Sequence, residues 1–158
     1  MFRPMRRFKQ QLSREDCLEL LQREKRGVLS LIGDEGYPYG VPLDFWYNPQ
    51  DGCLYFHCAP EGHKIDAMDR CDKVSFCVCS QGEPIEGDWA LKFQSVIVFG
   101  RLSRVEDPQN VRQALTALAE KFTDDQAYIQ KEIQTYAHRV QCLVLRPEQI
   151  TGKQIRES

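Results

Sequence analysis

The segment from residue 37 to residue 47 constrains the fold more than any other part of this sequence. One side of its alternating pattern carries only large side chains, namely Tyr37, Tyr39, Val41, Leu43, Phe45 and Tyr47. The intervening positions include two prolines and a glycine. A period of two predicts an extended strand. Because proline cannot donate to a strand ladder, such a strand must leave part of its backbone unpaired, where another molecule can approach it.

The rest of the chain alternates between strand-like and helix-like patterns. Strands are predicted over residues 28–32, 53–59, 74–79, 91–105 and 140–145, and helices over residues 13–27, 62–70, 107–122 and 124–138. Most connections between strands are too short for a crossover helix, so the strands are expected to pair antiparallel. The predicted fold is mainly β, a six-stranded antiparallel barrel with flanking helices. It is expected to form one domain over residues 1–158, with a short N-terminal helix and a C-terminal tail.

Charge and hydropathy exclude several classes of partner. The 21 basic and 23 acidic side chains nearly cancel, so no overall field attracts nucleic acid or an anionic membrane. No apolar run approaches the roughly 18 residues that a membrane span needs. The basic N-terminus lacks the apolar stretch and cleavage site of a signal peptide. The sequence therefore predicts a cytoplasmic protein that binds neither nucleic acid nor membranes.

The seven cysteines are many for a chain of this length. They could form disulfides, bind zinc or remain free. Disulfide frameworks are typical of small secreted chains, and structural zinc sites usually show paired Cys-x-x-Cys spacings, which are missing here. The pattern favours free thiols that pack as small apolar groups, without a metal site. Cys77 and Cys79 share one face of a predicted strand and are candidates for redox sensitivity.

A candidate anion site follows the strand at residues 53–59. Gly62 permits a tight turn, and His63 and Lys64 then open a helix. Basic side chains are unfavourable at a helix N-terminus unless an anion is bound there. Gly62, His63 and Lys64 are therefore predicted to bind phosphate, although a solvated surface lysine after a loop glycine would give the same pattern.

Four segments in order resemble one known family. They are Tyr-Pro-Tyr-Gly-Val-Pro-Leu (37–43), Tyr-Phe-His-Cys-Ala (55–59) followed by Gly-His-Lys-Ile-Asp (62–66), Val-Ser-Phe-Cys-Val (74–78) and Ser-Val-Ile-Val-Phe-Gly (95–100). Together they resemble the pyridoxamine 5′-phosphate oxidase-like split barrels, in the branch related to the 5-nitroimidazole resistance proteins. The resemblance spans roughly residues 5–153. It implies a six-stranded split barrel and a homodimer that holds FMN in clefts at its interface.

The resemblance also implies roles for individual residues. His63 and Lys64 would hold the FMN phosphate, and the flavin ring would lie along the backbone of Val41, Pro42, Leu43 and Asp44, with His57 and Ala59 nearby. Gln94 and Ser95 would reach the cofactor from the partner subunit. Lys153, in a tail that also resembles this branch, would add positive charge. His57 would either pack against the cofactor or act as a proton donor to the substrate.

The function that this resemblance implies is an FMN-dependent oxidoreductase that reduces a small acceptor, with nitroaromatics among the candidates. The substrate-phosphate residues of a true pyridoxamine-phosphate oxidase find no match near the C-terminus, which argues against vitamin B6 chemistry. Two alternatives remain open. One is a haem-binding split barrel with His57, His63 or His138 as axial ligand, and the other is a non-catalytic flavin-dependent sensor. A deazaflavin could also take the place of FMN.

Overall fold

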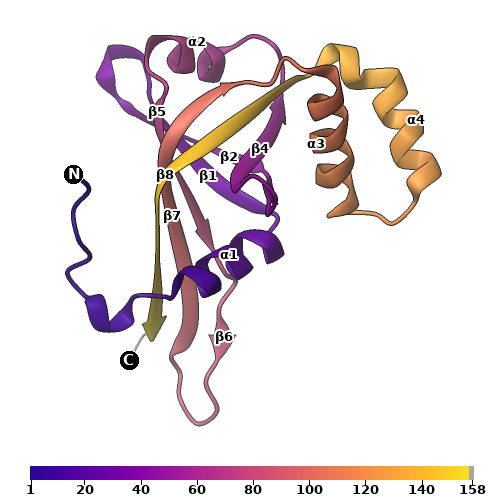
Figure 1. The fold of residues 1–158 in the computed structure, drawn as a ribbon. Coiled ribbons are helices and arrows are strands. Elements are labelled where there is room, and N and C mark those ends of the chain that lie inside the picture. The colour runs from indigo at the N-terminus through magenta and orange to yellow at the C-terminus, as the bar shows by residue number, and fades with distance from the viewer. Residues whose placement is uncertain (157–158) are drawn as a thin grey trace.

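The computed structural model describes residues 1–156, and its elements follow the predicted order closely (Figure 1). The helices are α1 (Arg14–Arg23), α2 (His63–Arg70), α3 (Pro108–Glu120) and α4 (Gln126–Tyr136). Short 3-10 turns occupy η1 (Phe8–Gln10), η2 (Asp34–Gly36) and η3 (Ala137–Arg139). The strands are β1 (Arg26–Ile32), β2 (Pro38–Asp44), β3 (Trp46–Asn48), β4 (Cys53–Cys58), β5 (Lys73–Cys79), β6 (Glu83–Pro84), β7 (Leu91–Arg104) and β8 (Gln141–Arg156).

The strands form one curled antiparallel sheet. Its order is β2-β1-β5-β7-β8-β4-β3, and the short β6 pairs with β7 outside this path. β2 and β3 therefore lie at opposite ends of the order, although only Phe45 separates them in the sequence. The sheet must curl until its two ends meet at this residue. The result is a half-open barrel, as the sequence predicted. Within residues 1–156 its sheet has eight strands instead of six, because the predicted strand at residues 37–47 divides into β2 and β3 and the short β6 was not predicted.

The main core fills the inside of this curl. Phe45, Phe56 and Phe76 are fully buried, and Phe76 packs edge-on against each of the other two rings with centroids 5.0 Å apart. Edge-to-face packing is a preferred geometry for aromatic pairs. Leu20 and Leu21 of α1 close one end of the core and are also fully buried. The burial of Phe45 at the meeting point couples closure of the barrel to formation of the core.

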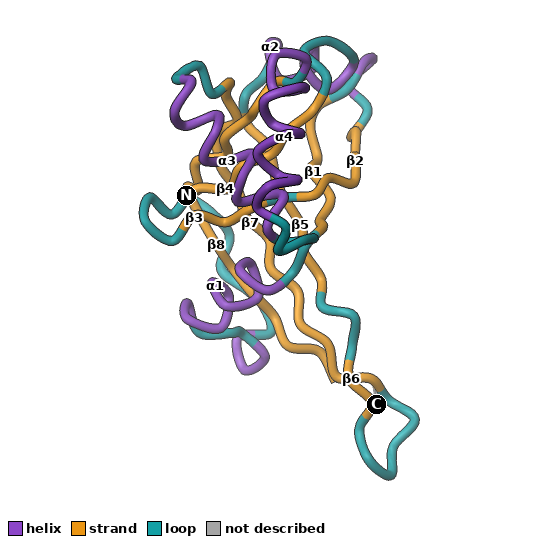
Figure 2. Tube along the Cα trace, turned by 90° about the vertical axis from the view of Figure 1, so that its right-hand side faces the viewer, coloured by secondary structure: helices purple, strands orange, loops and turns teal. Residues whose placement is uncertain are grey.

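The helices cover different parts of the sheet (Figures 1 and 2). α1 packs against β3, β7 and β8, and α2 lies at the other end of the molecule beside β1. α3 and α4 form a hairpin that stands to one side, with α3 against β3, β4 and β8. Ala114, Leu118, Ile129 and Ile133 are the buried side chains of this hairpin.

The structure differs from the sequence prediction mainly in the lengths of elements. The predicted strand at residues 37–47 is divided into β2 and β3 by Phe45. The final strand was predicted over residues 140–145 but extends from Gln141 to Arg156. Its second half pairs along β7, which supplies the backbone hydrogen bonds that its mostly polar sequence does not announce. Position 152 requires glycine, because the Cβ of any other residue would lie 2.5 Å from the Cys17 sulfur.

Candidate functional site

Helix α2 begins differently from the other three α-helices within residues 1–156. The side chains of Ser13, Asp107 and Asp125 each accept a hydrogen bond from a first-turn N–H of α1, α3 and α4. At α2 the N-cap is Gly62, at φ +123°, and no side chain caps the helix. Nothing lies within 4 Å of the position that a Cβ would occupy there. The N–H groups of His63 and Lys64 are therefore open to an anion, whereas that of Ile65 donates to the Gly62 carbonyl.

The two basic residues of this turn are used differently. The His63 ring stacks on Tyr39 of β2, with centroids 4.1 Å apart and an interplanar angle of 19°. Its Nε2 accepts a hydrogen bond from the Asp34 N–H at 3.4 Å. The ammonium of Lys64, in contrast, forms no hydrogen bond or ion pair within residues 1–156. Lys64 is thus the side chain available to an anion, whereas His63 links α2 to β2.

Lys64 and Arg104 also influence the pKa of Cys58, the last residue of β4. Burial raises the pKa of Cys58, and these two cations oppose the increase. Arg104 itself is held by a bidentate pair with Asp69 of α2, at 2.6 and 2.9 Å. Asp69 therefore neutralises Arg104, and Lys64 is left as the cation without a counter-ion at the start of α2.

β2 lies at the end of the strand order and pairs only with β1. The prediction that its backbone stays partly unpaired is therefore confirmed. Val41 and Leu43 pack against the core, whereas Pro42 is exposed. Asp44, the last residue of β2, accepts a hydrogen bond from Arg26 Nε at 2.7 Å. One edge of β2 thus has unpaired backbone groups, while the side chains of Val41 and Leu43 hold the strand against the core.

His57 and Asp44 meet in a pocket of about 300 Å³. His57 lies on β4 and pairs with Cys142 of β8. The walls come mainly from the α3–α4 hairpin, where Leu115, Leu118, Phe122, Ile133 and Tyr136 are apolar contributors. Glu132 of α4 also lines the pocket. Ala59, the other predicted residue of this region, is exposed just after β4, in the connection that leads to α2.

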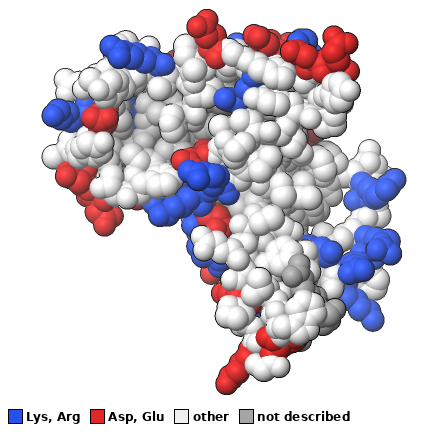
Figure 3. All heavy atoms as spheres, turned by 180° about the vertical axis from the view of Figure 1, so that it is seen from behind, with Lys and Arg blue, Asp and Glu red and all other residues white. Residues whose placement is uncertain are grey.

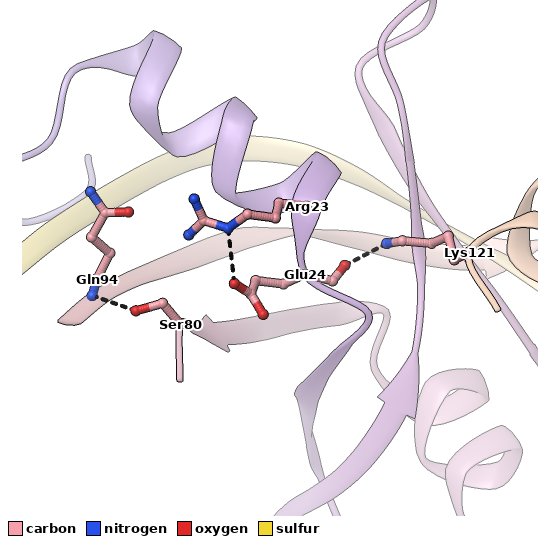
Figure 4. A network of polar contacts seen from close by, with 5 residues as sticks. All are labelled: Arg23, Glu24, Ser80, Gln94 and Lys121. Carbon is pink, nitrogen blue, oxygen red and sulfur yellow. Dashed lines mark hydrogen bonds and ion pairs between the residues drawn. The ribbon is translucent and has the colours of Figure 1, made fainter. Parts of the chain in front are cut away.

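Lys121 joins the hairpin to the edge strand. It caps the C-terminal end of α3, and its Nζ donates to the carbonyl oxygen of Phe45 at 2.8 Å. It also donates to the carbonyl oxygen of Glu24, a bond that Figure 4 shows. The same ammonium lies 4.2 Å from the centroid of the Phe45 ring. Burial lowers the pKa of Lys121 to about 8, and the nearby carboxylate of Asp44 opposes this shift. Lys121 therefore fixes the point where β2 turns into β3.

The predicted residues on β7 and β8 lie at the other end of the sheet. Ser95 pairs with Cys79 on one side and Lys153 on the other, in the part of the molecule that also carries β6 (Figure 1). The Gln94 N–H donates to Ser80 Oγ at 2.9 Å (Figure 4). α2 lies at the opposite end in Figure 1. Within one protomer, Gln94, Ser95 and Lys153 are thus not brought to His63 and Lys64.

Sequence reasoning missed several residues that shape this region. Tyr39 was placed with the other large residues of its strand, and its stack with His63 gave no signal along the chain. The helix predicted over residues 107–122 carries an apolar stripe of Val111, Leu115, Leu118 and Phe122. The stripe did not show that Leu115 and Phe122 line a pocket or that Phe122 is 53% exposed. Lys121 had no distinguishing local pattern. An exposed aromatic at the end of an amphipathic stripe was the one available hint.

All seven cysteines are free thiols, but only Cys17 and Cys142 are buried as small core groups; Cys79 is exposed and the other four are half-buried. Burial and the neighbouring Cys79 raise the pKa of Cys77 to about 11, so its thiol is mostly protonated at neutral pH and weakly nucleophilic. Among residues 1–156, no group of three or more His, Cys, Asp or Glu side chains has the geometry of a metal site. In the same part of the chain, every helix is too short or too polar to cross a membrane.

The curled sheet whose two ends meet at Phe45, with helices outside it, defines a split β-barrel protein. This chain belongs to the pyridoxamine 5′-phosphate oxidase family, whose model matches residues 13–154. No curated protein sequence matches the chain significantly. The family membership confirms the resemblance found in the sequence.

Solved structures of similar fold come from several bacteria. A candidate 5-nitroimidazole antibiotic resistance protein of Bacteroides thetaiotaomicron superposes with a TM-score of 0.77 at 22% identity, over 92% of this chain and 87% of that one. A FAD-binding protein of Mesorhizobium loti gives 0.66 at 24% identity, over 92% and 96%. A FAD and haem binding protein of Mycobacterium smegmatis gives 0.73 at 20% identity, over 94% and 74%. At these identities the likeness establishes the fold.

Proposed function

We propose that this protein binds FMN at the interface of a homodimer and acts as an oxidoreductase that reduces a small acceptor. One observation carries the proposal: the uncapped, basic start of α2 stands beside the open edge strand β2. The stack of His63 on Tyr39 joins the two directly. A ligand with a phosphate at one end and a flat ring at the other fits this arrangement, because the helix start favours the phosphate and the edge backbone can pair with the ring.

The proposal gives each predicted residue a task. Lys64 and the N–H groups of His63 and its neighbours hold the phosphate. The backbone from Val41 to Asp44 pairs with the polar edge of the ring, and Ala59 and His57 lie along its path. When bound, the flavin supplies the electron-transfer chemistry. The protein binds and orients it, and His57 donates a hydrogen bond or a proton to the molecule that is reduced.

FMN suits the site better than FAD because α2 offers a single anion site with one unpaired lysine. FAD would need further partners for its second phosphate and its adenosine. Two of the solved structures that share the fold are described as binding FAD, so chemical identification of the bound flavin is the direct test.

A second copy of the chain is the proposed partner. The outer face of β1, β5 and β7 exposes Val28 (41%), Ile32 (52%), Ile97 (39%) and Phe99 (39%). A view from behind shows a broad uncharged surface on the side where β1, β2 and β5 lie (Figures 2 and 3). Large exposed apolar patches of this kind mark association surfaces. Docking of a second copy there would bring its Gln94 and Ser95 to the cofactor, which one protomer does not do.

The proposed acceptor is a small redox-active molecule, with nitroaromatics as the leading class. The fold is shared with a candidate 5-nitroimidazole resistance protein, which supports testing them first. Seven free thiols suit a reducing compartment, so we place this activity in the cytoplasm.

The first experiment is the absorption spectrum of the purified protein, followed by mass spectrometry of whatever heat denaturation releases. Paired flavin bands and released FMN support the proposal. Release of FAD or a deazaflavin would mean that this molecule, and not FMN, is the cofactor. A sharp Soret band would instead favour haem, with His57 as the first ligand to replace. Reduction by a chemical reductant and reoxidation by 2-methyl-5-nitroimidazole then separates an enzyme from a sensor. A flavin that no acceptor reoxidises would contradict the enzymatic assignment.

A further inference from the structure

The pocket between the α3–α4 hairpin and the sheet has the size of a small-molecule site. Its volume of about 300 Å³ lies at the lower end of the range for such sites, roughly 300–1,000 Å³. Leu115 and Leu118 of α3 face Ile133 of α4 across it, so its walls are mostly apolar. A pocket of this size and character suits a flat molecule of one or two rings.

The pocket is continuous with the proposed cofactor site. Asp44 lies at the end of the edge strand and His57 on β4, and both line the pocket. A molecule held there would have its apolar part between the helices and its polar edge toward His57. The position of the hairpin is fixed by Lys121, which bonds to the carbonyl oxygen of Phe45 at the end of β2.

The charges of the lining select against anions. The ionisable groups that line the pocket are the carboxyls of Asp44 and Glu132, the His57 imidazole and the Tyr136 phenol, and no lysine or arginine of residues 1–156 joins them. Asp44 is paired with Arg26 at 2.7 Å, whereas Glu132 forms no ion pair within these residues. Four cations close to the lining are already occupied. The Lys121 ammonium bonds to two carbonyls and Arg26 pairs with Asp44. Lys25 and Arg139 lie 5.1 and 5.7 Å from the ring centroids of Phe122 and Tyr136. A phosphate or carboxylate in the pocket would be repelled by Glu132, and the lining holds no lysine or arginine to offset that repulsion.

We infer that this pocket seats the acceptor, that the acceptor is a flat uncharged heteroaromatic molecule, and that phosphorylated substrates are rejected. That the ligand is an electron acceptor rests on the proposed function. The selection by shape and charge rests on the pocket alone. Glu132 and the apolar walls determine specificity, and His57 meets the polar edge of the ligand.

The test uses two probes with the same ring system, neutral 1-naphthalenemethanol and anionic 1-naphthoate. Their binding to the purified full-length protein is measured by titration calorimetry, with flavin content recorded for each sample. Ala119→Trp fills the pocket from α3, and Ala127→Trp places the same side chain on an exposed part of α4 that does not line it. Ala137→Trp fills the pocket from the other wall if Ala119→Trp does not fold.

We expect the neutral probe to bind the parent and Ala127→Trp equally, and the filled variant at least about tenfold more weakly. Naphthoate should bind the parent about tenfold more weakly than the alcohol, and Glu132→Gln should reduce that gap. Binding that is unchanged by both filling variants, or an equal affinity for the anion, overturns the inference. If the protein holds no flavin but shows the expected pattern, the pocket assignment stands and the proposed function fails. If flavin is present and the filling variants leave probe binding unchanged, the pocket assignment fails and the proposed function stands.

Discussion

Two lysines, Lys64 and Lys121, show how differently this chain uses the same side chain. Lys121 closes the C-terminal end of α3, where a cation is favourable, and it contacts two backbone carbonyls and the Phe45 ring. Lys64 stands in the first turn of the uncapped α2, where a cation is unfavourable, and has no partner in residues 1–156. One lysine completes the scaffold. The other has no partner among the described residues, and this difference is why Lys64 is the proposed ligand contact.

The largest effect is expected for Lys64→Glu. It places a carboxylate beside the proposed phosphate and removes a charge-assisted hydrogen bond, so flavin affinity should fall about 100-fold or more. The measurement is flavin content after purification and a fluorescence titration with FMN. Lys131→Glu, at an exposed position of α4, is the matched control and should keep the flavin. A folded Lys64→Glu protein with unchanged flavin would remove the phosphate site from α2.

The next effect is on stability and concerns the other lysine. Lys121→Met leaves the half-buried carbonyls of Glu24 and Phe45 without their donor, which should cost about 2 kcal/mol in the free energy of unfolding. Urea denaturation of the apoprotein measures this cost, with Lys131→Met as the control. A loss no larger than that of the control would mean that Lys121 does not fix the junction of β2 and β3.

The same substitution at Lys64 sharpens the comparison because it should act in the opposite direction. Lys64→Met removes a cation from the N-terminal turn of α2 and should leave the apoprotein as stable, or more stable by about 0.5 kcal/mol. Flavin binding should nevertheless weaken. Thermal unfolding with and without FMN separates the two effects. A large loss of stability without ligand would show that Lys64 is a scaffold residue like Lys121.

The smallest effect is the pH dependence of the contribution that Lys121 makes to the free energy of unfolding. Burial lowers its pKa from 10.5 to about 8 in the folded state. Between these values the unfolded chain holds a proton that the folded chain has released, so the stability of the parent rises with pH. Relative to Lys121→Met, the parent should therefore gain stability as the pH increases from 8 toward 10.5. A difference between the two proteins that stays constant over this window would show that the pKa of Lys121 is not lowered.

Much of the candidate site was accessible from the sequence because its signals are local. Pro38, Gly40 and Pro42 identified a strand with open backbone, since proline lacks the N–H that a central strand needs. Gly62, His63 and Lys64 identified an unusual helix start, since basic residues follow a glycine where an acidic or hydroxyl cap is normal. In both cases the local chemistry conflicts with ordinary secondary structure, and the conflict pointed to a ligand.

Other features depend on residues far apart in the chain. The second half of β8 forms a strand only because β7 is there to pair with it. Lys121 meets Glu24 and Phe45, which lie 97 and 76 residues away. The pocket exists because the α3–α4 hairpin stands over His57.

The sequence by itself determined the order of most strands and helices, the edge position implied by the prolines and the unusual basic start of α2. Each of these follows from side chains within about one turn or one strand of each other. Only the tertiary structure decided that the sheet closes at Phe45, that His63 stacks on Tyr39 and that the hairpin turns its apolar side into a pocket. Those outcomes depend on which surfaces pack together, and packing is set by the shape and burial of the whole chain.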